Sequence, residues 1–163
     1  MSDKTTKIQS RLAQLGIVIP QAITPVANYV TTVQSGQHVF ISGQLPFDEK
    51  GKLFAVGKVN TEVDATKAKK AAELCAINIL GHAQATLGTL NTFKRIVKIT
   101  AFVATTPSFT DISQIANGAS DFFLQILGEA GRHARSAIGV TALPMDATVE
   151  VEAILEIQKE DNS

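Results

Sequence analysis

Arg135 and Glu150 are the residues of this sequence best suited to chemistry on a small acid. An arginine presents a flat fork of N–H donors that fits a carboxylate with two parallel hydrogen bonds. A glutamate nearby can accept a proton from water or from a substrate. Both lie within residues 131–157, in two apolar runs joined by a Leu-Pro turn. These runs predict a hairpin-like pair of strands, which would bring the arginine and the glutamate into one site.

Three neighbouring residues leave the roles of this pair open. Glu152 follows Glu150 by two positions in an alternating run, so both carboxylates face the same side of the predicted strand. Arg132 can share the anion-binding role with Arg135 or compete for it. His133 stands between the two arginines and, as a histidine, can titrate near neutral pH. The residue pattern alone does not choose among these alternatives.

Hydrophobic periodicity predicts the elements that must position these residues. Residues 1–26 are expected to form an N-terminal helix and an extended connector that contains Pro20 and Pro25, and Ser108 is expected to cap the third helix. The predicted helices span residues 5–15, 64–87 and 109–127, and the predicted strands span 29–33, 38–46, 93–104, 136–143 and 149–158, with a further short strand at 53–59.

Four single residues inside these elements call for an interpretation. Gly43 interrupts a strand, which indicates either a bulge or a place where another group approaches the backbone closely. Cys75 lies in the apolar stripe of the second helix and is interpreted as a buried small residue rather than a nucleophile. His82 has no partner at metal-ligand spacing, so we expect a surface or interface histidine. Asn117, inside the third helix, is by default a buried structural hydrogen bonder.

The chain of 163 residues predicts one α+β domain, with a mixed β-sheet and two helices packed on one face. The other face carries apolar residues as well, and a chain of this size has no second layer of helices to cover it. We therefore expect a homo-oligomer with a site near the seam between subunits.

Composition excludes several classes of protein. Lys+Arg and Asp+Glu both number 15, which argues against nucleic acid as a partner. Cys75 is the only cysteine, so one chain can form neither a disulfide nor a cysteine-only metal site. The polar N-terminus does not resemble a signal peptide, and no apolar run is long enough to span a membrane. These features predict a cytoplasmic protein with no membrane partner.

Four motifs, in order and spacing, resemble the RidA/YjgF family: ISGQLP at 41–46, ARSAIGV at 134–140, LP at 143–144 and VEVEAI at 149–154. The match extends over roughly residues 27–157, and the added N-terminal helix is similar to a longer subgroup of that family. The resemblance implies a chorismate-mutase-like fold and a homotrimer with pockets at the subunit interfaces. It also implies an enzyme, a hydrolase that deaminates reactive enamines and imines such as 2-aminoacrylate to 2-oxo acids and ammonia, without cofactor or metal.

The resemblance also assigns roles to residues. Arg135 matches the arginine that holds the carboxylate of a small 2-imino or 2-oxo acid, and Glu150 matches the glutamate that activates water. The pocket positions fall on four further residues: Tyr29, Ser42, Gly43 and Asn117. One departure is Ala137, which stands where short members often have a cysteine; imine hydrolysis needs no thiol.

Two other functions compete with deamination. A protein that only binds a small carboxylate metabolite would need Arg135 but not Glu150. An endoribonuclease or translation inhibitor, an activity attached to the family name, would need a basic surface for phosphates, and the neutral net charge argues against it.

Overall fold

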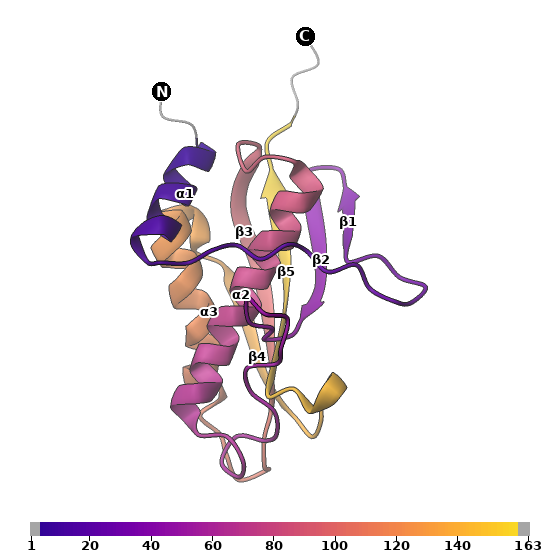
Figure 1. Ribbon diagram of the computed structural model, residues 1–163, viewed down its shortest axis with the longest axis vertical. Coiled ribbons are helices and arrows are strands. Elements are labelled where there is room, and N and C mark those ends of the chain that lie inside the picture. Colours follow the sequence, from indigo (N-terminus) through magenta and orange to yellow (C-terminus); the bar gives the residue numbers. More distant parts are fainter. Residues whose placement is uncertain (1–3, 160–163) are drawn as a thin grey trace.

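A five-stranded mixed β-sheet forms the centre of the protein in the computed structural model, which describes residues 4–159 (Figure 1). The strand order is β1-β2-β5-β3-β4; β3 and β4 run parallel, and the other neighbours are antiparallel. The strands are β1 (Thr32–Ser35), β2 (His38–Gln44), β3 (Phe93–Ala104), β4 (Ala134–Val140) and β5 (Val149–Ile157).

Two long helices, α2 (Ala65–Leu87) and α3 (Ile112–Leu127), cover one face of this sheet (Figure 1). The Asp64 side chain starts α2 by accepting a hydrogen bond of 2.8 Å from the backbone N–H of Lys67. Cys75 and four alanines of α2 are fully buried, so the helix packs closely on the strands; the alanines are Ala68, Ala71, Ala72 and Ala76. Gly118 of α3 lies against the backbone carbonyl of Lys69, where the two helices meet. The predicted α+β fold, with one mixed sheet and two helices on one face, is confirmed.

The helix α1 (Lys4–Gln14) packs against α3 through the buried side chains of Ile8 and Leu12. Arg11 Nη1 donates a hydrogen bond of 2.8 Å to the carbonyl oxygen of Ile126 at the end of α3. From α1, the connector runs across α2 toward β1 (Figure 1). It rests on α2 at Gly81, where a β-carbon would lie 2.9 Å from the carbonyl oxygen of Pro20.

The predicted hairpin between the last two strands is wrong, because β3 lies between them. β4 follows α3 and pairs with β3 in parallel, as a crossover through a helix requires. The chain then passes through residues 141–148, which include the short 3₁₀ turn η2 (Pro144–Asp146), and returns as β5 on the other side of β3. This connection is too long for a tight hairpin, so local pairing is not enforced.

Several local predictions also differ from the structure. Residues 53–59 form isolated bridges, such as Phe47 with Leu53, rather than a strand. The first predicted strand, residues 29–33, begins at Thr32 instead. α3 begins after Asp111, and the Ser108 hydroxyl bonds to that of Thr106 instead of capping the helix. A second 3₁₀ turn, η1 (Gly128–Gly131), ends α3.

Candidate active site

Glu150 lies on the face of the sheet that the helices leave open. It stands in β5 opposite Phe102 of β3, and its carboxylate is half-buried, whereas Glu152 on the same face is exposed. Burial raises the pKa of Glu150, and the nearby Glu152 carboxylate raises it further. A glutamate with a raised pKa is a better proton acceptor than an exposed one. Burial therefore distinguishes the two glutamates that the sequence pattern left equivalent.

Gly43 makes room for this carboxylate over β2. The register of β2 against β5 shifts between Ile41 and Gln44, so Ser42 and Gly43 form a bulge. A β-carbon on Gly43 would collide with the Glu150 carboxylate, reaching 2.6 Å from Cδ. Both interpretations of this glycine, a bulge and a close approach, are therefore correct. The glycine allows Glu150 to reach from β5 over the neighbouring strand.

A cavity of about 340 Å³ lies beside this bulge, lined by Tyr29, Ser42 and Gly43 among others. The backbone N–H of Ser42 donates to the carbonyl of Thr31, the residue before β1, at 2.9 Å. The Ser42 hydroxyl oxygen is buried and has no hydrogen-bond partner within residues 4–159. Tyr29 is 57% exposed at the cavity. These three residues and Glu150 are called the Glu150 cluster below.

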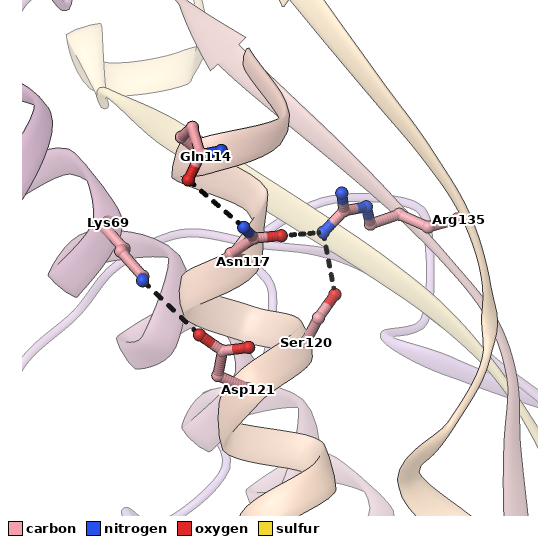
Figure 2. Close-up of polar contacts among 6 residues, drawn as sticks. All are labelled: Lys69, Gln114, Asn117, Ser120, Asp121 and Arg135. Atoms are coloured by element: carbon pink, nitrogen blue, oxygen red, sulfur yellow. Dashed lines mark hydrogen bonds and ion pairs between the residues drawn. The ribbon is translucent and has the colours of Figure 1, made fainter. Parts of the chain in front are cut away.

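Arg135 faces the opposite way, toward the helices. In β4 it stands opposite Ile99, a core residue on the helix-covered face of the sheet. Its Nη1 donates hydrogen bonds to Asn117 Oδ1 at 2.8 Å and to Ser120 Oγ at 3.1 Å, both on α3 (Figure 2). Nε and Nη2 of Arg135 have no partner in the described part of the chain, so two donors of the fork are available to a carboxylate.

Asn117 and Ser120 lie one helical turn apart and hold the guanidinium from α3. The Asn117 amide is oriented because its Nδ2 donates to Gln114 Oε1 at 3.5 Å while its Oδ1 accepts from Arg135. Ser120 was not predicted as a site residue. Its spacing of three from Asn117, which puts both on one helix face, is the signal that could have found it. Asn117 is thus a hydrogen bonder, with the candidate carboxylate-binding arginine as its partner.

His133 completes this arrangement. Its Nδ1 lies 2.5 Å from the carbonyl oxygen of Gly131 and must donate, so in the neutral ring Nε2 accepts from the Ser120 hydroxyl at 2.9 Å. Burial lowers the pKa of His133; the Gly131 carbonyl opposes this shift, and the Arg135 charge adds to it. Arg132 points elsewhere, pairing with Glu129 at 3.1 Å. Asn117, Ser120, His133 and Arg135 are called the Arg135 cluster below.

The two clusters do not meet within one chain. Glu150 lies on the open face and reaches over β2, while the Arg135 cluster lies on the helix-covered face at the β4 edge. Within residues 4–159, no three histidine, cysteine or acidic side chains gather as a metal site would require. In the same residues, no helix combines the length and apolarity needed to cross a membrane.

Comparison with known proteins connects this geometry to a family. Residues 19–157 match the family described as endoribonuclease L-PSP. The chain belongs to this family, also called RidA/YjgF. Protein TCP17 of Trypanosoma cruzi is 43% identical over 152 residues, which are 93% of this chain and 94% of the relative. The crystal structure of Atu1372 from Agrobacterium tumefaciens has a TM-score of 0.89 and 44% identity, covering 95% of each chain.

A more distant relative has a name that states an activity. The 2-iminobutanoate/2-iminopropanoate deaminase of Dermatophagoides farinae is 27% identical over 142 residues, which are 87% of this chain and 95% of the relative. Ala137, where short RidA/YjgF members often have a cysteine, follows Arg135 by two positions and packs against the core. Cys75 is fully buried, which raises the pKa of its thiol, so it stays protonated and is not a nucleophile.

Proposed function

We propose that this protein hydrolyses 2-imino acids, such as those formed from 2-aminoacrylate, to 2-oxo acids and ammonia. The observation that carries the proposal is the Glu150 carboxylate, half-buried over Gly43 beside a cavity, with its pKa raised by burial. A base of this kind suits the activation of water near neutral pH. The free donors of Arg135 add a site for the substrate carboxylate. The name of the relative from Dermatophagoides farinae supports the same reaction class.

The site we propose is shared between subunits. Because the two clusters lie on opposite faces and toward opposite edges of the sheet, a head-to-tail arrangement would bring the Glu150 cluster of one subunit to the Arg135 cluster of the next. A head-to-tail arrangement forms a ring when the rotation between neighbours closes, and we propose a closed trimer. The open sheet face offers apolar surface for it, since Phe40 is 45% exposed and Ile138 is 42% exposed.

In the proposed mechanism, Arg135 holds the substrate carboxylate and Glu150 removes a proton from water. The water oxygen bonds to the imine carbon, and the electron pair of the C=N bond moves to nitrogen. Glu150 returns the proton to nitrogen, which gives a carbinolamine with one hydroxyl and one amino group. Glu150 then takes the hydroxyl proton and delivers it to the amino nitrogen; the C=O bond forms as the C–N bond breaks, so that the imine and one water become a 2-oxo acid and ammonia. An imine carbon is already electrophilic, so orientation and proton transfer are the main requirements.

A coupled assay tests this proposal. A serine dehydratase generates 2-aminoacrylate, semicarbazide traps the imine, and added protein should accelerate loss of the imine to pyruvate. Arg135→Ala should abolish the acceleration. If the wild-type protein leaves the rate unchanged, the proposed function is wrong. If pyruvate nevertheless binds in calorimetry and Arg135→Ala removes that binding, the alternative of a non-catalytic carboxylate-binding protein is supported instead.

A further inference from the structure

The cavity beside the Glu150 cluster is walled by the N-terminal connector. Residues 20–26 line it, together with the end of β2 and Asn78 and His82 of α2. Asn78 Nδ2 donates to the carbonyls of Leu45 and Phe47 at 3.1 and 3.0 Å, which fixes the segment after β2 against the helix. The connector keeps its place because Gly81 lets Pro20 lie directly on α2. The cavity, here called the connector pocket, is therefore built from parts with defined positions.

His82 is, like Ser42, a polar side chain of the connector pocket without a hydrogen-bond partner within residues 4–159. His82 is 7% exposed within the subunit, whereas a surface or interface position was expected, and it lines the connector pocket. No other group within residues 4–159 forms a hydrogen bond with it. Burial lowers the pKa of His82, so at neutral pH the ring is uncharged, with one donor and one acceptor nitrogen. The ring nitrogens are not sealed from the pocket, because Ser42 Oγ is the one enclosed side-chain atom without a partner within residues 4–159. A group bound in the pocket can therefore pair with the ring in place of water.

The remaining lining is uncharged. None of the described residues around the connector pocket is a lysine, arginine, aspartate or glutamate, and Ile23, Leu45 and Phe47 make much of it apolar. A charged group entering this pocket would lose its hydration without a counter-charge. Its volume of about 340 Å³ is far larger than a one-carbon side chain needs; a water molecule takes up about 30 Å³ in the liquid. The pocket thus suits a longer, neutral chain.

We propose that the connector pocket binds the side chain of the substrate, and that His82 donates a hydrogen bond to an acceptor near its end. Gly43 joins the two regions, since it lines the pocket and lies under the Glu150 carboxylate. The inference rests on the proposed function. It assigns as substrates 2-imino acids with an uncharged side chain of roughly four or five heavy atoms, a size within the range of small-ligand pockets.

A matched pair of substrates tests the role of His82. An L-amino-acid oxidase generates the imines of norleucine and O-methylhomoserine, which have the same length and differ by one ether oxygen; the imines of alanine and glutamate are the small and the charged controls. We expect wild-type kcat/KM to favour the ether over norleucine about fivefold, which is the effect of one neutral hydrogen bond. His82→Leu should remove this preference, His82→Gln should retain it, and neither should change the rate with the alanine imine.

A second variant tests the connector wall. Ala22 is a half-buried connector residue that lines the pocket, and Ala22→Phe should fill it. We expect kcat/KM for the norleucine and O-methylhomoserine imines to fall at least tenfold, and kcat/KM for the alanine imine to stay unchanged. If the wild type turns over every imine but neither variant changes the ratios, the side-chain assignment is wrong and the deaminase proposal stands. If no imine is turned over, the deaminase proposal fails. Calorimetry with the 2-oxo acids that correspond to the four imines then tests whether the connector pocket binds a side chain. Equal affinities of wild type and His82→Leu for each acid would overturn the proposed role of the pocket.

Discussion

Glu150 has its chemical character because of what surrounds it rather than because of its residue type. Glu152 is two residues away on the same face, yet it is exposed, while Glu150 reaches over Gly43 and loses part of its hydration. Desolvation and the neighbouring negative charge both favour the protonated form, and so both raise the pKa of Glu150. Because of these two causes, the ionised Glu150 lowers the free energy of unfolding. They also make the Glu150 carboxylate a stronger proton acceptor.

Substitution of Glu150 should separate these two effects. Glu150→Gln is expected to lower imine-hydrolysis kcat by about 10²–10⁴, the usual contribution of a general base, whereas Glu152→Gln should change it little. Wild-type kcat/KM should rise with pH through a pKa above the ordinary glutamate value of 4.5. Equal losses in the two variants would contradict the assignment.

Stability should depend on pH in a corresponding way. A carboxyl group whose pKa is raised in the folded state contributes its stability below the unfolded pKa and loses it as pH rises through the folded pKa. Glu150→Gln should therefore unfold with the same free energy as wild type near pH 4 and with a higher one at pH 8. Urea denaturation at both pH values measures the difference. A variant less stable than wild type at pH 8 would contradict the assigned cause of the shift.

Gly43 gives a second residue-level prediction. Gly43→Ala places a methyl group where the Glu150 carboxylate lies, so the carboxylate must move away. We expect a loss of kcat of at least tenfold, because small displacements of a catalytic group are costly. The neighbouring Ser42→Ala is a matched control within the bulge. Ser42→Ala removes a buried hydroxyl that has no hydrogen-bond partner within residues 4–159, so it should not lower the free energy of unfolding. Retained activity in Gly43→Ala would show that the carboxylate position is not critical.

At the scale of elements, the sequence predicted what local patterns determine. The long helices and the β2, β3 and β5 runs have strong periodicity, and they lie where it indicates. The pairing of β4 with β3 rather than β5 was missed, because strand order depends on the crossover through α3 and not on the strand sequences. For the same reason, the sequence suggested Arg135 and Glu150 as site residues but did not predict that they lie on opposite faces of the sheet. The burial of His82 was missed because the connector that covers it carries no periodic signal.

The contact between α2 and α3 provides a prediction at this scale. Gly118 would place a β-carbon on the Lys69 carbonyl, so the helices can approach only with a glycine there. Gly118→Ala should lower the free energy of unfolding by about 1–3 kcal/mol through overpacking, although alanine favours helix formation by about 1 kcal/mol over glycine. Gln125→Ala, at an exposed position of α3, should lie within about 0.5 kcal/mol of wild type. Denaturant titration measures both, and a stabilised Gly118→Ala would refute the close contact.

At the scale of the whole molecule, the opposite placement of the two clusters makes the proposed activity a property of the assembly. Each subunit would present Glu150 to one neighbour and Arg135 to the other, so every seam of the ring would contain one complete site. A twofold dimer would instead bring like surfaces together and would not unite the two clusters. In the ring, the two residues of one site come from different subunits, and oligomers that mix two variants can test this.

Co-expression of two inactive variants should restore activity. Arg135→Ala and Glu150→Gln homo-oligomers are each expected to be inactive, but in mixed rings some seams join an intact Glu150 from one subunit to an intact Arg135 from the next. With random mixing in equal amounts, about one seam in four is intact, so activity should return to about a quarter of the wild-type value. Two different affinity tags isolate the mixed rings; each of these has one intact seam of three, so their activity should be about a third of the wild-type value. A double variant mixed with wild type is the matched control. If both residues acted within one chain, no mixture of the two single variants would regain activity.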